Sequence, residues 1–247
     1  TADVQQNYPE EWGSEDQRVA DAVGKLQELA ALGVRTIVDP TVIGLGRYIP
    51  RIQRVAEQVD LSRTSTSVAI VADADAEDLM RIFGDPEVVR YWSTGAWTDI
   101  AQAEAMIAEA RQAYRDGGLY RYAIALRDTD RLIGVCNLRG FFEQNRRCEL
   151  GYALARGHWG QGYAAEALEA LLGHAFYELD INRIEADIDP RNDASARLLE
   201  KLGFRREGTM PERWIVHGEK ADTAFYGLLR RYWDERAGSR SSAHATA

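Results

Sequence analysis

The stretch Cys148–Ala167, C-E-L-G-Y-A-L-A-R-G-H-W-G-Q-G-Y-A-A-E-A, decides the fold. It opens as an apolar run that alternates well enough for a strand, then passes through Gly157, Gly160 and Gly162 into a helical pattern. The first backbone N–H groups of such a helix are unpaired, and together with the helix dipole they suit a phosphate or pyrophosphate. Glycine tolerates positive φ and places no Cβ between ligand and backbone. The sequence therefore predicts a phosphate-bearing ligand at residues 157–165.

The composition describes an acidic chain with enough apolar material for a packed core. Of its 247 residues 45% are hydrophobic, and the formal net charge is −9 with a pI near 5.1. This acidity argues against non-specific nucleic-acid binding, which needs a basic footprint. No apolar run approaches the ~20 residues that span a bilayer, so we expect no membrane segment.

Cysteine and histidine usage argues against disulfides and metals. Cys136 and Cys148 each lie in a strand-like run, which predicts two buried reduced thiols and a cytoplasmic protein. The four histidines have no spacing typical of metal ligands. We therefore expect no metal site.

Residues 1–64 form the first of three predicted segments, with a helix that ends near Gly33, a strand over 36–38 and a second helix through Val59. Within it, V-D-P-T-V-I-G-L-G-R-Y-I-P-R-I-Q-R-V-A at 38–56 resembles an early βα unit of the phosphotriesterase-like amidohydrolases, which are metal-dependent (β/α)₈ barrels. The metal ligands of that family would precede residue 1 or follow residue 64, and a barrel needs ~250 residues. We interpret 1–64 as a fragment without hydrolase activity.

A second domain is predicted over 65–235, after the polar turn-like stretch at 61–67. We expect helices from residue 73 and over 102–114, 164–179 and 193–202, and strands over 68–71, 120–127, 132–138, 148–155, 183–188, 212–216 and 223–229. The third segment, 236–247, is rich in Ser, Ala and Gly and is predicted to be disordered. The fold class is therefore α/β (α+β), with a helix-strand-helix appendage at the N-terminus.

The glycines allow two interpretations of the ligand. Gly160, Gly162 and Ala165 satisfy G-x-G-x-x-A, and Glu185 lies where a Rossmann acidic residue would. Against a dinucleotide, the preceding strands are hairpin-like, and few residues remain after the motif to complete a doubly wound sheet. The stretch beyond Glu185 is also particular: D-P-R-N-D-A-S-A-R-L-L-E-K-L-G-F at 189–204.

The glycine loop W-G-Q-G-Y-A-A-E-A followed by N-x-x-S-x-x-L-L-E-K-L-G-F resembles the GNAT acetyltransferase superfamily, in the branch of the RimJ/RimL-like ribosomal-protein Nα-acetyltransferases. The resemblance runs from about Ser67 to Trp233 and includes D-P-E-V-V-R-Y-W and R-L-I-G-V-C. It implies a mixed, mostly antiparallel central sheet flanked by helices, and acetyl-CoA as a substrate. It places the pyrophosphate on the loop and the pantetheine along the end of the preceding strand. The cofactor-binding residues that it implies are Tyr152, Ala153, Leu154, Ala155, Arg156, Gly157, Gly160, Gln161, Gly162, Tyr163, Ala164 and Asn192.

Two residues are candidates for the chemistry. Glu149 is the candidate general base, directly or through water, with a solvent-facing strand glutamate as an equal alternative. The family often has a tyrosine at the place of Leu199 to protonate the departing thiolate, and leucine cannot do so. The resemblance offers Ser195 instead, against a merely polar residue in a first helical turn. Asn192 could bind pantetheine, cap the helix, or do both.

The function expected is acetyl-CoA-dependent N-acetylation of a primary amine, either a protein N-terminus or a small amine, in a ternary complex. Alternatives are a non-catalytic CoA-binding or interaction module and a dinucleotide-binding enzyme. Trp92, Trp97 and Trp214 are expected to line the acceptor pocket, with specificity set by loops near 90–100 and 139–147. We expect no nucleic acid or membrane partner, and a monomer or homodimer.

Overall fold

The computed structural model describes residues 20, 65–116 and 118–236. The predicted appendage at 1–64 and nearly all of the predicted tail at 236–247 lie outside these residues. Apart from residue 117, the described part of the chain covers the whole of the predicted second domain, 65–235.

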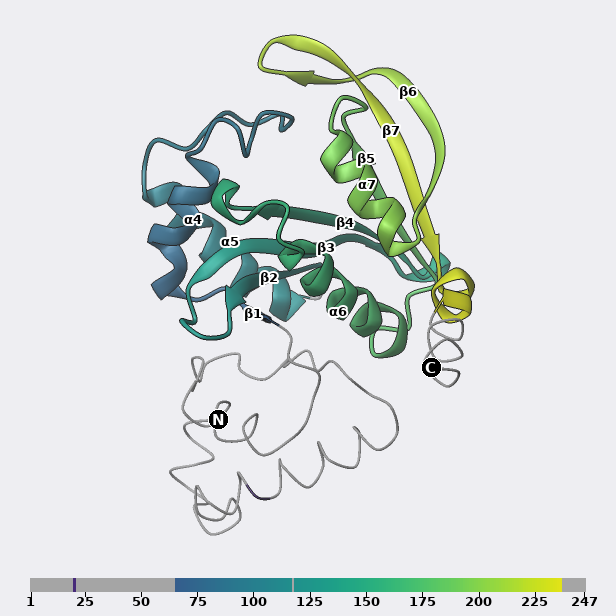
Figure 1. Ribbon diagram of the computed structural model, residues 1–247, viewed down its shortest axis with the longest axis horizontal. Coiled ribbons are helices and arrows are strands. Elements are labelled where there is room, and N and C mark those ends of the chain that lie inside the picture. The colour runs from purple at the N-terminus through teal and green to yellow at the C-terminus, as the bar shows by residue number, and fades with distance from the viewer. Residues whose placement is uncertain (1–19, 21–64, 117, 237–247) are drawn as a thin grey trace.

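The described residues build one seven-stranded sheet in the order β1-β2-β3-β4-β5-β7-β6 (Figure 1). Only β4 and β5 pair in parallel, and every other neighbouring pair is antiparallel. This topology confirms the mixed, mostly antiparallel sheet and shows that the doubly wound Rossmann alternative is wrong. The strands are β1 Thr66–Ile70, β2 Leu119–Leu126, β3 Leu132–Phe142, β4 Arg147–Leu154, β5 Arg183–Ile188, β6 Arg205–Val216 and β7 Glu219–Leu229.

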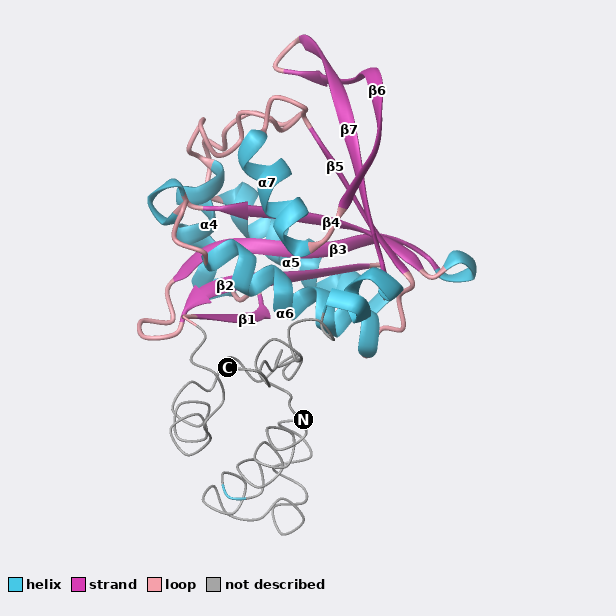
Figure 2. Cartoon of the chain, turned by 45° about the vertical axis from the view of Figure 1, so that its right-hand side comes forward, coloured by secondary structure: helices cyan, strands magenta, loops and turns pink. Residues whose placement is uncertain are grey.

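Helices cover both faces of the sheet, and each face has its own core. On one face α4 (Ala76–Phe83) and α5 (Ala101–Asp116) pack on β2 and β3, and on the other α6 (Tyr163–Tyr177) packs on β1 and β3 beside α7 (Asp193–Leu202) (Figure 2). Short 3₁₀ turns η2 (Asp73–Asp75), η3 (Glu143–Asn145) and η4 (Arg156–His158) complete the order. No helix among the described residues is long and apolar enough to cross a membrane.

The alternation of β4 decides which of its side chains reaches which face. Cys148, Leu150 and Leu154 belong to the core beneath α6 and α7, whereas Ala153 belongs to the core beneath α4 and α5. Helix α6 supplies buried residues at helical spacing to the first core, which fixes the helix against the strand that leads into it. Its buried residues are Ala167, Leu168, Leu171, Leu172, Ala175 and Phe176.

Most predicted elements are present, but the last two strands and one loop differ. β6 begins at Arg205 and β7 at Glu219, well before the predicted 212 and 223. The two strands form a long twisted ribbon that extends beyond the rest of the sheet (Figure 1). The loop predicted over 139–147 is shorter, because β3 continues to Phe142 and turns through η3 into β4. The region 86–92 is a series of turns.

Both cysteines are free and buried, as predicted. Burial raises the pKa of the Cys136 thiol, and burial with the nearby charges of Glu149 and Glu185 raises that of Cys148 to about 12. Both thiols therefore stay protonated at neutral pH and act as core residues.

Candidate active site

The site begins where β4 and β5 stop pairing. Their parallel ladder runs from Arg147–Arg183 through Cys148–Ile184 to Glu149–Glu185 and ends there. β4 continues to Leu154, paired with β3 on its other edge, while β5 continues to Ile188, paired with β7. The two strands thus separate, and one edge of β4 beyond Glu149 has no paired neighbouring strand. We call the region between the separated strands the opening.

The glycine loop lies at the far end of this opening. β4 passes through η4 into Gly160, with φ +73°, and Gly162, with φ +90°, which is the N-cap of α6. A Cβ built on Gly157, Gly160 or Gly162 meets no atom within 4 Å. The loop backbone is therefore open on its outer side, as a site that admits a ligand against main-chain N–H groups must be.

The loop holds its shape by contacts of its own. Gln161 Nε2 donates to the Gly157 carbonyl at 2.9 Å, and Trp159 Nε1 donates to the Leu154 carbonyl at 2.7 Å. Arg156 Nε lies 3.0 Å from the Asp85 carboxylate, so one edge of this guanidinium ties the loop to the segment after α4. These contacts fix the loop before any ligand binds.

Glu166 connects the first turn of α6 to β1. Its carboxylate accepts hydrogen bonds from Thr66 N at 2.6 Å and from Thr66 Oγ1 at 2.5 Å. Thr66 is buried at the start of β1. The strand where the described domain begins is thus joined directly to the helix that follows the glycine loop.

The N-terminus of α7 lies across the opening from β4. Asn192 is its N-cap, and its side chain accepts a hydrogen bond from Ser195 N at 3.1 Å, so the predicted capping role is confirmed. The turn before it is organised by buried Asp189, which accepts from Arg191 N, Nε and Nη2 at 2.8, 2.9 and 2.6 Å. The hydrogen bonds from the Arg191 side chain lower the pKa of Asp189.

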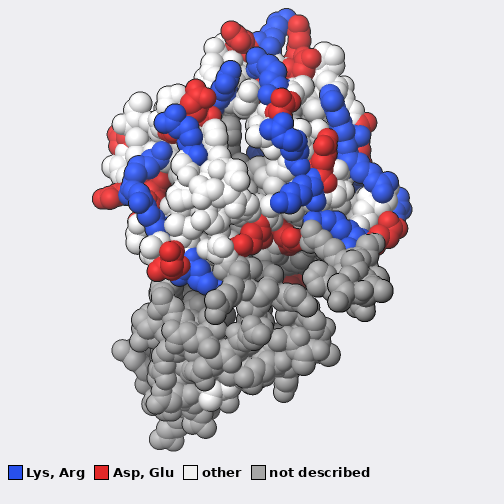
Figure 3. Space-filling model, viewed as in Figure 1, with Lys and Arg blue, Asp and Glu red and all other residues white. Residues whose placement is uncertain are grey.

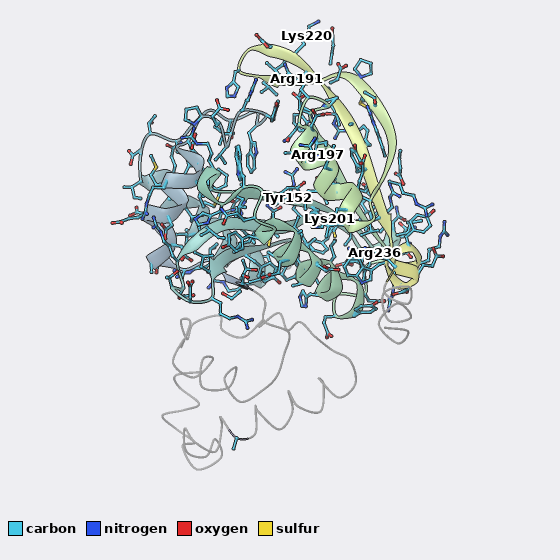
Figure 4. All side chains as sticks on the ribbon, viewed as in Figure 1. Tyr152, Arg191, Arg197, Lys201, Lys220 and Arg236 are labelled. Atoms are coloured by element: carbon cyan, nitrogen blue, oxygen red, sulfur yellow. The ribbon has the colours of Figure 1, made fainter. Side chains whose placement is uncertain are left out.

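Ser195 and Tyr152 meet across the opening. The Tyr152 hydroxyl oxygen lies 2.5 Å from Ser195 Oγ. Ser195 is 8% exposed, and in Figure 4 Tyr152 lies at the level of β4 beside α7. Leu199, at the place of the family's tyrosine, is fully buried in the core. The sequence predicted one hydroxyl group at this place, that of Ser195, and the structure shows a second, that of Tyr152, bonded to it.

Glu149 points to the face of the sheet opposite to that of Tyr152. It is the last β4 residue paired with β5, and Oε2 lies 3.3 Å from Arg139 Nη2. Its side chain is 38% exposed. The structure therefore places this carboxylate at the apex of the opening, in contact with both solvent and a cation.

The three tryptophans expected at an acceptor pocket have different neighbours. Trp92 and Trp97 both pack on Phe83, with ring centroids 5.3 and 4.5 Å apart, as parts of the core beneath α4 and α5. Trp214 on β6 is 39% exposed, and its Nε1 donates to Asp187 Oδ2 at 3.1 Å. Trp92 and Trp97 thus pack against the core, Trp214 contacts β5, and their place at an acceptor pocket stays a prediction.

Several contacts escaped sequence reasoning because they join segments far apart in the chain. Tyr91 Oη donates to the Arg191 carbonyl at 3.2 Å, and Arg156 meets Asp85. On the side viewed in Figure 3, Lys and Arg gather over α7 and the β6–β7 ribbon, although the chain is acidic. Arg197 and Lys201 on α7 are exposed there (Figure 4). Within the described ranges no cluster of His, Cys, Asp and Glu could hold a metal ion.

Comparison with known proteins gives two family matches, one on each side of residues 69–80, where they overlap. Residues 69–205 match the family model of the acetyltransferase (GNAT) domain, and residues 1–80 match that of the phosphotriesterase family. An uncharacterized N-acetyltransferase, p20 of Bacillus licheniformis, is 37% identical over 157 residues, which are 64% of this chain and 88% of that protein. The structure of Mycobacterium smegmatis RimJ in complex with CoA-disulfide superposes with a TM-score of 0.62 at 24% identity, over 67% of this chain and 82% of that one.

The N-terminal match is close but short. The phosphotriesterase homology protein of Mycobacterium tuberculosis is 64% identical over 62 residues, which are 25% of this chain and 19% of that protein. The family match reaches residue 80 and so overlaps β1, η2 and the start of α4. Both resemblances expected from the sequence are thus confirmed.

Proposed function

The chain belongs to the GNAT acetyltransferase family, and we propose that it transfers the acetyl group of acetyl-CoA to a primary amine within a ternary complex. The observation that carries this proposal is the opening between β4 and β5, which ends at a glycine loop and a helix N-terminus. An extended thioester arm fits along an unpaired strand edge, and its pyrophosphate fits the helix N-terminus. The catalytic domain is residues 65–235, and residues 1–64 take no part in the reaction.

The cofactor would lie along the residues that border the opening. Backbone groups of Tyr152, Ala153, Leu154 and Ala155 would pair with the pantetheine, and Asn192 would contact it from the other side. The loop from Arg156 through Gly157, Gly160, Gln161, Gly162, Tyr163 and Ala164 would hold the pyrophosphate. Exposed Arg197 and Lys201 lie on α7, the helix that begins at Asn192, and cations on this helix would attract the phosphates of CoA.

The chemistry needs a proton acceptor and a stabilised leaving group. The amine nitrogen attacks the thioester carbonyl carbon, the C–S bond breaks on collapse, and sulfur leaves with the electron pair. Glu149, directly or through water, takes the proton that nitrogen loses and passes it to solvent. Ser195 donates a hydrogen bond to the departing thiolate, which then takes its proton from solvent. Alignment of the two reactants supplies much of the rate.

The acceptor would approach from the face that carries Glu149. Glu185 and Asp187 on β5 alternate with the core residues Ile184 and Ala186, and so share that face. Arginines pair with all three carboxylates, so the preference for a cationic amine rests on the net charge of −9 of the whole chain, which acts through long-range attraction. The acceptor is the amino group of a protein N-terminus or of a small amine, and a panel of both kinds decides between them.

Turnover of acetyl-CoA tests this function. Release of CoA is followed with a thiol reagent across N-terminal peptides, polyamines, amino acids and aminoglycosides, with the acetylated product identified by mass spectrometry. At least one amine should give product at a rate that saturates in both substrates. Binding of acetyl-CoA without turnover on any amine favours a non-catalytic CoA-binding module, to which Leu199 at the place of the family's tyrosine already points. The two free buried thiols further support a reducing compartment, and we propose the cytoplasm.

A further inference from the structure

The hydroxyl groups of Tyr152 and Ser195 form a hydrogen bond that spans the opening. Their oxygens are 2.5 Å apart, although the residues belong to β4 and α7 and are separated by 43 positions in the chain. Each partner is held by its own element. Tyr152 pairs with Cys136 of β3, while Ser195 is buried and its N–H is bound by the N-cap Asn192. The contact is therefore a fixed feature of the fold.

Either hydroxyl could donate in this contact, and the direction decides whether Ser195 can serve a ligand. Burial raises the pKa of the Tyr152 phenol to about 12, so it keeps its hydrogen at neutral pH. A serine hydroxyl has a single hydrogen and can accept while it donates. If Tyr152 donates to Ser195 Oγ, the hydrogen of Ser195 is available for a third group. If Ser195 donated to Tyr152 instead, the Ser195 hydrogen would point at the phenol oxygen and would not be available to a ligand.

We propose that Tyr152 is a positioning residue for acetyl transfer, whose phenol donates to Ser195 Oγ and so directs the Ser195 hydrogen toward the sulfur of CoA. This inference rests on the proposed function. No proton leaves Tyr152, which acts through Ser195 and stabilises the thiolate by polarising its donor. β4 thereby supplies the phenol that position 199 of α7 lacks.

The proposal predicts that bound CoA favours its thiolate form. If Ser195 donates to sulfur, the protein binds CoA increasingly more tightly than desulfo-CoA as pH rises from about 7 to about 9, through the range in which a thiol ionises. A hydrogen bond to a charged group is strong enough to shift a pKa by about one unit. With an ordinary thiol pKa of about 8.5 lowered by one unit, the wild-type protein should gain about sixfold in its preference for CoA across this range.

Four variants test the role of Tyr152: Tyr152→Phe, Ser195→Ala, the double variant that carries both changes, and the control Tyr177→Phe. Tyr152→Phe removes the hydroxyl and keeps the ring, and it should lose most of the pH-dependent preference and lower kcat about tenfold. KM for acetyl-CoA should change by no more than about twofold. Ser195→Ala should behave like the double variant, because the tyrosine acts only through the serine. Tyr177→Phe loses a phenol bonded to Asp234 at the far end of α6 and should match the wild type.

The outcomes separate this inference from the proposed function. Wild-type protein that binds and turns over acetyl-CoA, with Tyr152→Phe unchanged in kcat and in the pH-dependent preference, overturns the inference alone. Wild-type protein that shows no such preference overturns it as well, whether or not the variant folds. Failure of wild-type protein to bind any CoA compound overturns the proposed function.

Discussion

Glu149 of β4 and Glu185 of β5 form the last rung of the only parallel pairing among the described strands. Beyond this rung each strand keeps its other neighbour, so the sheet stays intact while its centre opens. The same rung places a carboxylate at the apex of the opening. The end of one strand ladder thus positions the proposed cofactor and the proposed base together.

Substitution in the glycine loop should abolish stabilisation by acetyl-CoA. In Gly160→Val or Gly162→Val a branched side chain would occupy the outer side of the loop, where the glycines leave space. Valine would also be strained at the positive φ of these positions. A ligand that binds only the folded state raises Tm through mass action, and this shift is measured by differential scanning fluorimetry. Gly218→Val in the β6–β7 turn, with φ +84°, is a matched control for backbone strain and should retain the shift. Loss of the shift in both kinds of variant would contradict the assignment.

Removal of the Glu149 carboxylate should slow turnover with little effect on cofactor binding. Glu149→Gln keeps the shape and should lower kcat by ~10²-fold or more, the usual range for a general base. The matched variant Glu185→Gln loses ion pairs with Arg147 and Arg183, and should raise KM for a cationic amine while leaving kcat largely intact. Unchanged kcat in Glu149→Gln across the pH range would return that residue to a structural role.

The Asp189–Arg191 pair should stabilise the domain at neutral pH and not in acid. A carboxyl group whose folded-state pKa is lowered contributes stability above its unfolded pKa of about 3.9, and this stability is lost as pH falls through the folded value. Asp189→Asn should cost about 1 kcal/mol at neutral pH, because Arg191 is largely exposed. Tm measured from pH 7 down to about pH 3 should show the deficit shrinking. Asp128 is an exposed turn residue, and Asp128→Asn serves as the control. A deficit in Tm of Asp189→Asn that is equal at all pH values would refute the pairing.

Residues 1–64 should be dispensable, but the boundary should be sharp. A chain that begins at Ser65 keeps both Thr66 bonds to Glu166 and the Arg127 N bond to the Ser65 carbonyl, and should bind and turn over acetyl-CoA like the full chain. A chain that begins at Ala69 loses these bonds and buried Val68, and should have a lower Tm. Insolubility of the chain that begins at Ser65, or its loss of acetyl-CoA binding while folded, would mean that the preceding segment covers a surface the domain needs.

The sequence predicted the elements whose patterns are local. The helix over 193–202 has an Asn192 cap and a Gly203 end, and the structure gives it the same limits. The start of β6 was missed because all of its residues before Val216 are exposed, so no alternation marks it. The strand also carries Pro211 and a break in pairing between Met210 and Trp214. An exposed edge strand lacks the hydrophobic period on which strand prediction depends.

The sequence predicted the backbone features of the site, but it did not predict which side chains contact one another there. The glycine loop and the α7 cap follow from short motifs, because a helix N-terminus and a positive φ are local properties. The Tyr152–Ser195 contact and the Arg156–Asp85 pair depend on how distant segments pack. The packing of Trp92 and Trp97 on Phe83 also depends on the fold, and their expected place at an acceptor pocket stays a prediction.

A thermal-shift panel of acetyl-CoA, CoA, NAD and NADP at equal concentrations tests the central claim most directly. Stabilisation follows RT ln(1 + [L]/Kd), so a true ligand raises Tm in proportion to the logarithm of its concentration once it exceeds Kd. We predict a concentration-dependent rise with acetyl-CoA and with CoA, and none with either dinucleotide. A rise with NAD or NADP and none with the CoA compounds would contradict the account.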